Sequence, residues 1–171
     1  MASNFLDTLS HTQHGAPSRL GAYNRLEIIG YGYLTVFWRA MRYADRQMVC
    51  LKNVRVFEMT AADRKLTLNE VKFMEAFSHP NLFTLIEAFI EQNELWVCLE
   101  FISGGGNLGL LIHNMQEFKK QADEFDIWRV IYFISAGLSH MHQHGMFHKC
   151  LKPTNVLITD RGEIKVYSEI K

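Results

Sequence analysis

The glycine-rich run SGGGN at positions 103–107 divides the sequence into two parts of different character. Strand-like segments rich in β-branched and aromatic residues precede the run, and segments with helical periodicity follow it. Consecutive glycines impose no single backbone conformation, so the run is typical of a flexible joint. Because strands and helices are segregated along the chain, the sequence predicts an α+β fold with two lobes.

Five strands and one helix are expected before this joint. The strand segments are YNRLEIIG (23–30), LTVFWRAM (34–41), QMVCLKNVRV (47–56), FTLIEAFI (83–90) and ELWVCLEF (94–101). The helix is expected at about 60–77, with Thr60 as its N-cap, and Pro80 prevents its continuation. After the joint we expect helices at about 108–118 and 124–144, then short strands at 155–159 and 163–167. The prediction is a five-stranded antiparallel sheet with one helix, followed by a helical part.

The composition restricts the classes of partner. The chain has 171 residues, 48% of them hydrophobic, and its 18 basic and 18 acidic residues cancel. A neutral chain has no basic field for nucleic acid, and no apolar run approaches the roughly 20 residues that span a bilayer. We therefore expect no nucleic acid and no membrane as partner. The polar start lacks a signal-peptide pattern, which predicts a flexible leader at 1–20 ahead of lobes at 21–103 and 104–171.

The cysteines point to a reducing compartment. Cys50, Cys98 and Cys150 are odd in number and widely spaced. Such a set does not build a disulfide framework, so an intracellular location is expected.

A lysine and a glutamate suggest a phosphate site in the first part. Lys52 lies inside an otherwise apolar strand, and Glu70 falls on the apolar face expected from positions 66, 73, 74 and 77 of the helix. A carboxylate on a buried face needs a partner, and Lys52 is the available cation. The hairpin GYGYLT, with Gly30 and Gly32, would let backbone N–H groups approach phosphate oxygens. Taken separately, an outward-pointing lysine and an ordinary hairpin are the simpler interpretations, and it is their joint occurrence with Glu70 that favours a phosphate site.

The segment FHKCLKPTNVLI at 147–158 offers a second set of polar groups. On a loop behind a helix, Lys152 could neutralise a transferring phosphate and Asn155 could hold a divalent cation. A different interpretation is a zinc site, because His140 and His144 are one helical turn apart and Cys150 follows. Solvated loop residues and surface histidines are the simpler alternatives.

Six segments carry a resemblance to a known family. They are IGYGYLT, VCLKNVRVFEM, LNEVKFMEAFSHPNL, FIEQNELWVCLEF, EFKKQ and FHKCLKPTNVLI. From residue 21 onward the chain resembles a eukaryotic protein kinase and is most similar to the short NIMA-related serine/threonine kinases. The resemblance implies a kinase-like fold, ATP and Mg²⁺ as cofactors, and phosphoryl transfer to protein serine or threonine.

The resemblance also implies roles for individual residues. The nucleotide site would comprise the covering loop Gly30, Gly32 and Thr35, the adenine slot Phe37, Cys50 and Leu157, the phosphate pair Lys52 and Glu70, the gatekeeper Leu99, and the hinge Glu100 to Ile102. Lys152 corresponds to the catalytic-loop lysine and Asn155 to the metal-binding asparagine.

The chain departs from the family at the residues that perform the chemistry. The family's catalytic aspartate is Cys150 here, and its magnesium-binding aspartate is Ser168, followed by Glu169. A serine hydroxyl is a weak ligand for a hard dication, and loss of a general base typically costs about 10²–10⁴-fold in rate. Phe37 and Cys50 replace a smaller valine and alanine in the adenine slot, which predicts weakened nucleotide binding.

The end of the sequence adds a further expectation. The chain stops at Lys171, before the family's activation segment and remaining helices. We expect the apolar surface of the long helix, with Phe133 on its flank, to be exposed, so that the chain is marginally stable, needs a partner, or is a fragment of a longer product.

Three functions are therefore open. The first is a pseudokinase that acts by binding proteins, including full-length family kinases or cytoskeletal and spindle proteins, with residual ATP binding. The second is an active ATP-dependent serine/threonine kinase in which Glu169 replaces the missing metal ligand. The third is the zinc-binding module around His140, His144 and Cys150.

Overall fold

The structure is a computed structural model that describes residue 9 and residues 17–76, 78–104 and 106–167. The chain forms two compact units. The described residues up to 76, together with 84–101, form the first unit, and residues 78–83 with those from 102 onward form the second. Ser168 and Glu169 lie outside the described residues.

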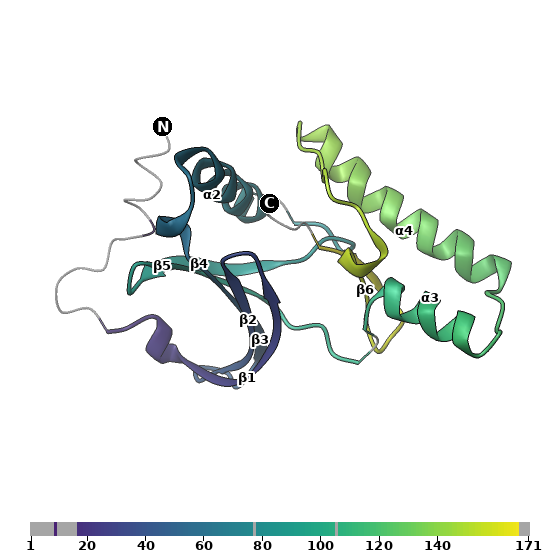
Figure 1. The fold of residues 1–171 in the computed structure, drawn as a ribbon, viewed down its shortest axis with the longest axis horizontal. Coiled ribbons are helices and arrows are strands. Elements are labelled where there is room, and N and C mark those ends of the chain that lie inside the picture. Colours follow the sequence, from purple (N-terminus) through teal and green to yellow (C-terminus); the bar gives the residue numbers. More distant parts are fainter. Residues whose placement is uncertain (1–8, 10–16, 77, 105, 168–171) are drawn as a thin grey trace. The chain divides into compact units, whose positions relative to one another are not determined.

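The first unit is built on an antiparallel sheet (Figure 1). Its strands are β1 (Tyr23–Gly32), β2 (Thr35–Arg42), β3 (Met48–Val54), β4 (Leu85–Glu91) and β5 (Glu94–Glu100). They are arranged in the order β1-β2-β3-β5-β4, and every neighbouring pair is antiparallel. The predicted α+β, kinase-like fold with a five-stranded antiparallel sheet is confirmed.

The two faces of this sheet have different roles. One face packs into a hydrophobic core of Leu20, Tyr23, Ala40, Val49, Leu51, Phe89, Trp96 and Cys98. Successive side chains of a strand point to opposite faces, so the residues between these core positions share the other face. The register places Phe37 opposite Lys52, and Cys50 opposite Leu99, on that second face. The sheet therefore separates its core from the predicted nucleotide-binding residues.

The helix α2 (Ala61–Ala76) begins where the sequence predicts. The hydroxyl of Thr60 accepts a hydrogen bond from the N–H of Asp63 at 3.1 Å, which caps the first turn. The predicted buried face is wrong at Leu66, which is 51% exposed, whereas Phe73 and Met74 of that face are half-buried. The fully buried positions are Thr67, Leu68 and Val71. α2 packs against β4 and against the 3₁₀ helix η2 (Val56–Glu58), and these contacts select that face.

The residues just before β1 are attached to β4. The Ser18 hydroxyl donates a hydrogen bond to Glu91 at 2.5 Å, and the Leu20 N–H donates to the same carboxylate at 2.9 Å. Arg19 forms an ion pair with Glu87 at 2.5 Å. These contacts lie at the start of η1 (Leu20–Ala22), and they fix the position at which the chain enters the sheet.

The second unit contains two helices and a small sheet. Its elements are α3 (Leu108–Glu117), α4 (Glu124–Gln143), η3 (Pro153–Asn155), β6 (Val156–Ile158) and β7 (Ile164–Val166). Side chains cap both helices, because Asn107 accepts from the Leu110 N–H and Asp123 accepts from the Phe125 N–H. α4 packs against β7, and α3 packs against η3 and β6.

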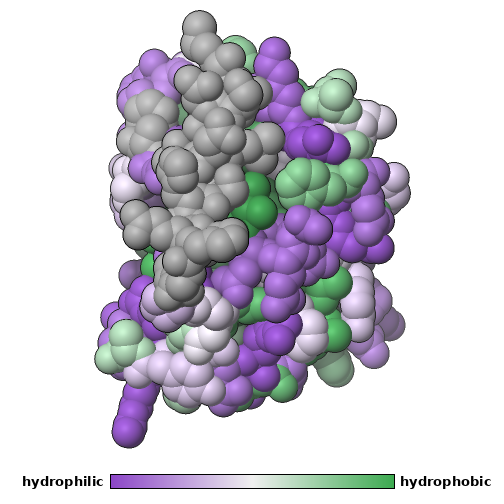
Figure 2. All heavy atoms as spheres, turned by 90° about the vertical axis from the view of Figure 1, so that its left-hand side faces the viewer, coloured by the Kyte–Doolittle hydropathy of each residue, from purple (hydrophilic) through white to green (hydrophobic). Residues whose placement is uncertain are grey.

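Much of the apolar stripe of α4 is exposed, as the sequence analysis expected for the long helix. Within α4 only Gly137 and Met141 are buried, whereas Ile127 and Ile131 are each 46% exposed. The face of the molecule in Figure 2 shows a different pattern, with polar residues interspersed among small apolar groups. Among the described residues, no helix has the length and apolar character that a membrane crossing requires.

Candidate functional site

The predicted glycine loop is a tight β-hairpin between β1 and β2. Gly32 lies opposite Thr35 in the register, so a two-residue turn joins the strands. The Thr35 hydroxyl donates a hydrogen bond to the Tyr33 carbonyl at 3.0 Å across this turn. Leu34, the second residue of this turn, has a positive φ of 52°. The structure confirms the hairpin, and its use in phosphate binding stays a prediction.

Phe37 occupies the space beside this hairpin. A Cβ at Gly30 would lie 3.7 Å from the Phe37 ring, and a Cβ at Gly32 would lie 3.9 Å from it. The Lys52 ammonium nitrogen is 5.6 Å from the ring centroid, within the range of a cation–π contact. The ring therefore lies close to both the glycines and the lysine, which the resemblance assigns to nucleotide binding.

Lys52 and Glu70 are both withdrawn from solvent. Lys52 is only 4% exposed on β3, so the interpretation of an outward-pointing lysine is wrong. Glu70 is half-buried on α2, and its Oε1 is inaccessible to water. Burying either charge is costly unless another group compensates it. The pairing of these two residues with each other stays a prediction.

Two residues of the predicted adenine slot and gatekeeper, Cys50 and Leu99, lie on neighbouring strands in the interior of the sheet. Cys50 and Leu99 are paired across β3 and β5, and both are buried. Burial raises the pKa of the Cys50 thiol to about 12, although nearby Lys52 opposes the shift. The thiol is therefore neutral and acts as an apolar side chain.

The hinge begins with a residue that already has main-chain partners. The Glu100 carboxylate accepts from the Thr84 N–H at 2.8 Å, and the Glu100 N–H donates to the Thr84 carbonyl at 3.0 Å. Ile102 is half-buried and lies outside the helices and strands. Adenine recognition by this segment stays a prediction.

The second unit folds the catalytic loop around a buried histidine. His148 Nε2 is 2.8 Å from the Tyr167 carbonyl, and its Nδ1 is 3.4 Å from the Cys150 N–H. Since a carbonyl only accepts and an N–H only donates, the neutral Nε2–H tautomer fits both contacts. Lys149 adopts φ 58°, a left-handed conformation that is uncommon for a residue with a side chain.

Asn155 holds the other end of this loop. Its side chain is buried, and its Nδ2 donates a hydrogen bond to the Cys150 carbonyl at 3.0 Å. The Asn155 carbonyl accepts from the Tyr167 N–H at 2.8 Å. Asn155 therefore joins the loop to the segment that follows β7.

The remaining predicted residues of this unit have different surroundings. Lys152 is exposed, and its backbone is in the extended conformation just before η3. Leu157 is half-buried on β6 and pairs with Asn107 and Lys165. That Lys152 contacts a phosphate and that Leu157 contacts an adenine remain predictions.

The described loop at 147–155 contains no carboxylate, the ligand that Mg²⁺ prefers within an octahedral set of oxygens. Cys150 presents sulfur in place of a carboxylate. Asn155 donates through its amide nitrogen to the Cys150 carbonyl, and its amide oxygen is the atom that a metal would use. Among the described residues, no group of three or more His, Cys, Asp or Glu side chains could hold a metal ion. The predicted zinc site is also wrong, because His140, His144 and Cys150 are all described and do not form such a group. Instead, the His140 ring packs against His144 and His79 at centroid distances of 4.7 and 5.0 Å.

The sequence analysis missed Tyr167 as an organiser of the loop. Its carbonyl faces His148 and its N–H donates to Asn155. Both contacts use the main chain, so no residue type could have signalled them.

Acid is expected to destabilise the chain through His148. Burial lowers the pKa of His148, although the contact with the Tyr167 carbonyl opposes the shift. Because the pKa in the folded state is below the unfolded value of about 6.5, the unfolded state binds more protons as the pH falls through that value. We expect the urea midpoint to be constant above that pH and to fall below it. The variant His148→Gln should weaken this loss, whereas the exposed control His113→Gln should retain it; equal pH profiles for all three chains would contradict the expectation.

A five-stranded antiparallel sheet with one helix, joined to a unit that carries the loop His-x-x-x-Lys-x-x-Asn, is the arrangement of a protein kinase domain. Residues 23–167 match the protein kinase domain family, so the chain belongs to this family.

Proteins named as serine/threonine kinases are among those similar to the chain. It is 36% identical over 123 residues to the probable serine/threonine-protein kinase mkcD of Dictyostelium discoideum, covering 71% of this chain and 18% of the relative. It is 31% identical over 152 residues to the serine/threonine-protein kinase fray1 of the same organism, covering 88% and 26%. It is 28% identical over 156 residues to the cell division control protein 2 homolog 3 of Trypanosoma brucei brucei, covering 89% and 47%. The chain thus spans less than half the length of each of these relatives.

Proposed function

We propose that the chain is a pseudokinase of the NIMA-related type that acts by binding other proteins and does not transfer phosphate. The supporting observation is the state of the catalytic loop. His148, Asn155 and the Tyr167 main chain form its hydrogen-bond framework, yet Cys150 stands where the family has its catalytic aspartate. The loop keeps its architecture without its base.

The chemistry of the replaced groups supports this proposal. A general base must accept the proton of the attacking hydroxyl, and its loss typically costs about 10²–10⁴-fold in rate. Ser168 replaces the metal-binding aspartate in the sequence, outside the described residues. The two losses affect one catalytic unit, so their costs do not simply multiply, but either one is severe.

The proposal also covers cofactor, partners and location. ATP with Mg²⁺ is the family's cofactor, and we propose that this chain binds it weakly because Phe37, which lies close to the glycines and to Lys52, is larger than the valine that the resemblance implies. The proposed partners are full-length family kinases or cytoskeletal proteins, at an intracellular location.

An active ATP-dependent serine/threonine kinase is the second candidate. The relatives named as serine/threonine kinases favour it, as does the presence of Lys52 and Lys152 at the family positions. In this alternative Glu169 would replace the lost metal ligand.

A radiolabel experiment tests the choice between these functions. With γ-labelled ATP, Mg²⁺ and a mixed protein substrate, we expect the chain to transfer no more label than its Lys52→Met variant does. Each preparation should be analysed by mass spectrometry to exclude a contaminating kinase. Label on serine or threonine that disappears in Lys52→Met would establish the active kinase and overturn the pseudokinase proposal.

A further inference from the structure

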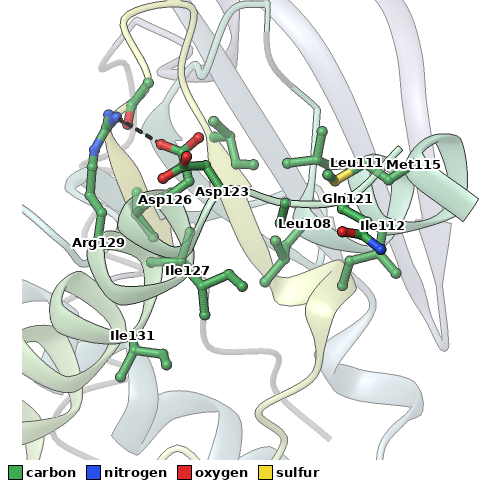
Figure 3. Close-up of a pocket in the computed structure, with 15 residues that line it drawn as sticks. Leu108, Leu111, Ile112, Met115, Gln121, Asp123, Asp126, Ile127, Arg129 and Ile131 are labelled. Carbon is green, nitrogen blue, oxygen red and sulfur yellow. Dashed lines mark hydrogen bonds and ion pairs between the residues drawn. The ribbon is translucent and has the colours of Figure 1, made fainter. Parts of the chain in front are cut away.

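The second unit contains an apolar groove between α3 and α4 that the kinase chemistry does not use. The groove encloses about 600 Å³, within the usual range of binding pockets and far above an ordinary packing void. Figure 3 shows apolar side chains of α3 and of α4 lining it. The aliphatic lining residues are Leu108, Leu111, Ile112, Met115, Ile127, Val130, Ile131, Ile158 and Ile164.

The spacing of these residues is helical on both sides. On α3 they recur at i, i+3, i+4 and i+7, beginning at Leu108, and on α4 at i, i+3 and i+4, beginning at Ile127. Leu111, Ile112, Ile127 and Ile131 nevertheless remain 40–46% exposed. Two helices that present such stripes toward one open groove can bury them against a third helix.

Acidic residues lie at one end of the groove. Asp123 and Asp126 lie close together beside Arg129 (Figure 3). The guanidinium of Arg129 donates to the Gly162 carbonyl and is 3.8 Å from Asp126. Glu124 adds a further negative charge to the same turn. The charge at this end is therefore negative, which favours a cationic group on the occupant.

We propose that the groove binds an amphipathic helical segment of another protein, with aliphatic residues on one face and arginine or lysine at one end. A second copy of the chain would bring the same carboxylates to a self-complementary interface, which the charge disfavours. The inference rests on the proposed protein-binding role. The two can fail separately, because peptide binding is measured without ATP and phosphoryl transfer without the peptide.

The test uses a labelled alanine-based helical peptide with leucines at i, i+3, i+4 and i+7 and a terminal run of arginines. Fluorescence anisotropy with the whole chain should show saturable binding that weakens as salt increases. A peptide with glutamates in place of the arginines should bind at least about tenfold more weakly. Equal binding of the two peptides, or no binding of the arginine peptide, would overturn the proposal.

Neighbouring residues provide matched variants. Leu111→Gln removes a lining residue and should weaken binding about tenfold, whereas Leu110→Gln, at a similarly exposed position outside the lining, should change it less than about twofold. Ile127→Gln and Trp128→Gln form a second such pair on α4. Asp126→Asn should reduce the salt dependence, and Glu124→Gln should reduce it less. Equal effects within either hydrophobic pair would contradict the proposed groove.

Sedimentation velocity tests whether a second copy of the chain, and not a segment of another protein, occupies the groove. We expect the chain without peptide to be monomeric at micromolar concentration. A dimer that Leu111→Gln dissociates and Leu110→Gln does not would assign the groove to a second copy of the chain and overturn the proposed partner.

Discussion

Phe37→Val is expected to increase the affinity of the chain for ATP by on the order of tenfold. In the wild-type chain the Phe37 ring is near the glycine hairpin, 3.7 Å from where a Cβ at Gly30 would lie, and its centroid is 5.6 Å from the Lys52 ammonium. A cation–π contact of a desolvated lysine contributes roughly 1–2 kcal/mol, which a phosphate must replace. Valine removes both the ring and this competition, and it restores the residue that the family resemblance implies. The affinity is measured by calorimetry with ATP, and the melting temperature should rise with ATP concentration.

The matched control for this substitution is Phe57→Val. Phe57 also lies against a cation, with the Arg64 guanidinium 5.2 Å from its ring centroid, but it is 49% exposed near the start of α2. Phe57→Val should leave ATP affinity unchanged. Without ATP, Phe37→Val should melt below the wild-type chain, since it loses packing and the lysine contact. ATP affinity that is the same in the wild-type chain and in Phe37→Val would show that the ring does not obstruct the nucleotide.

The order of the elements could be predicted because each strand and helix carries a local signal. The segment from Leu95 to Leu99 is apolar and includes Trp96 and Val97, which favour strands, and it lies within β5 as expected. Thr60 and Asp63 provide a helix start that the structure confirms. The third strand was predicted too long, because Val56–Glu58 forms a 3₁₀ turn after β3 ends at Val54. Such a boundary depends on the packing of α2, which a strand pattern does not contain.

The side-chain environments were harder to predict than the elements. Leu66 was assigned to the buried face of α2, but the contacts with β4 and η2 bury Leu68 and Val71 instead. A helix with apolar residues on more than one side does not reveal which of them a neighbour will cover. The groove between α3 and α4 was missed for a related reason. The exposure of α4 was expected, but the stripe of α3 has the same periodicity as a buried one, so only the structure shows that the two stripes line one groove.

The loop contacts required the structure as well. The sequence identifies Cys150 as the residue in place of a general base, and the resemblance assigns Asn155 to a metal. The left-handed conformation of Lys149, however, places the Cys150 carbonyl where the Asn155 amide can donate to it. No local preference favours a lysine in that conformation, so the hydrogen bond could not be anticipated.

The hydrogen bond from Asn155 to the Cys150 carbonyl leads to a prediction that tests whether Asn155 also binds a metal. Asn155→Asp should lower the free energy of unfolding by about 1–3 kcal/mol, because it replaces a buried donor with an acceptor that faces the Cys150 carbonyl. Were Asn155 kept for a metal, an aspartate there would be an equal or better ligand for Mg²⁺. Urea denaturation, with and without millimolar MgCl₂, measures both effects.

The exposed control on α3 is Asn114→Asp, which should leave the urea midpoint within experimental error because its side chain is solvated. Asn155→Ala should be destabilising like Asn155→Asp, since it too leaves the Cys150 carbonyl without this donor. Magnesium should restore neither variant, because the loop presents a thiol and main-chain groups in place of the carboxylates that a hard dication prefers. Recovery of Asn155→Asp, but not of Asn155→Ala, on adding Mg²⁺ would show that the loop retains a metal site, and the case against phosphoryl transfer would then rest on Cys150 alone.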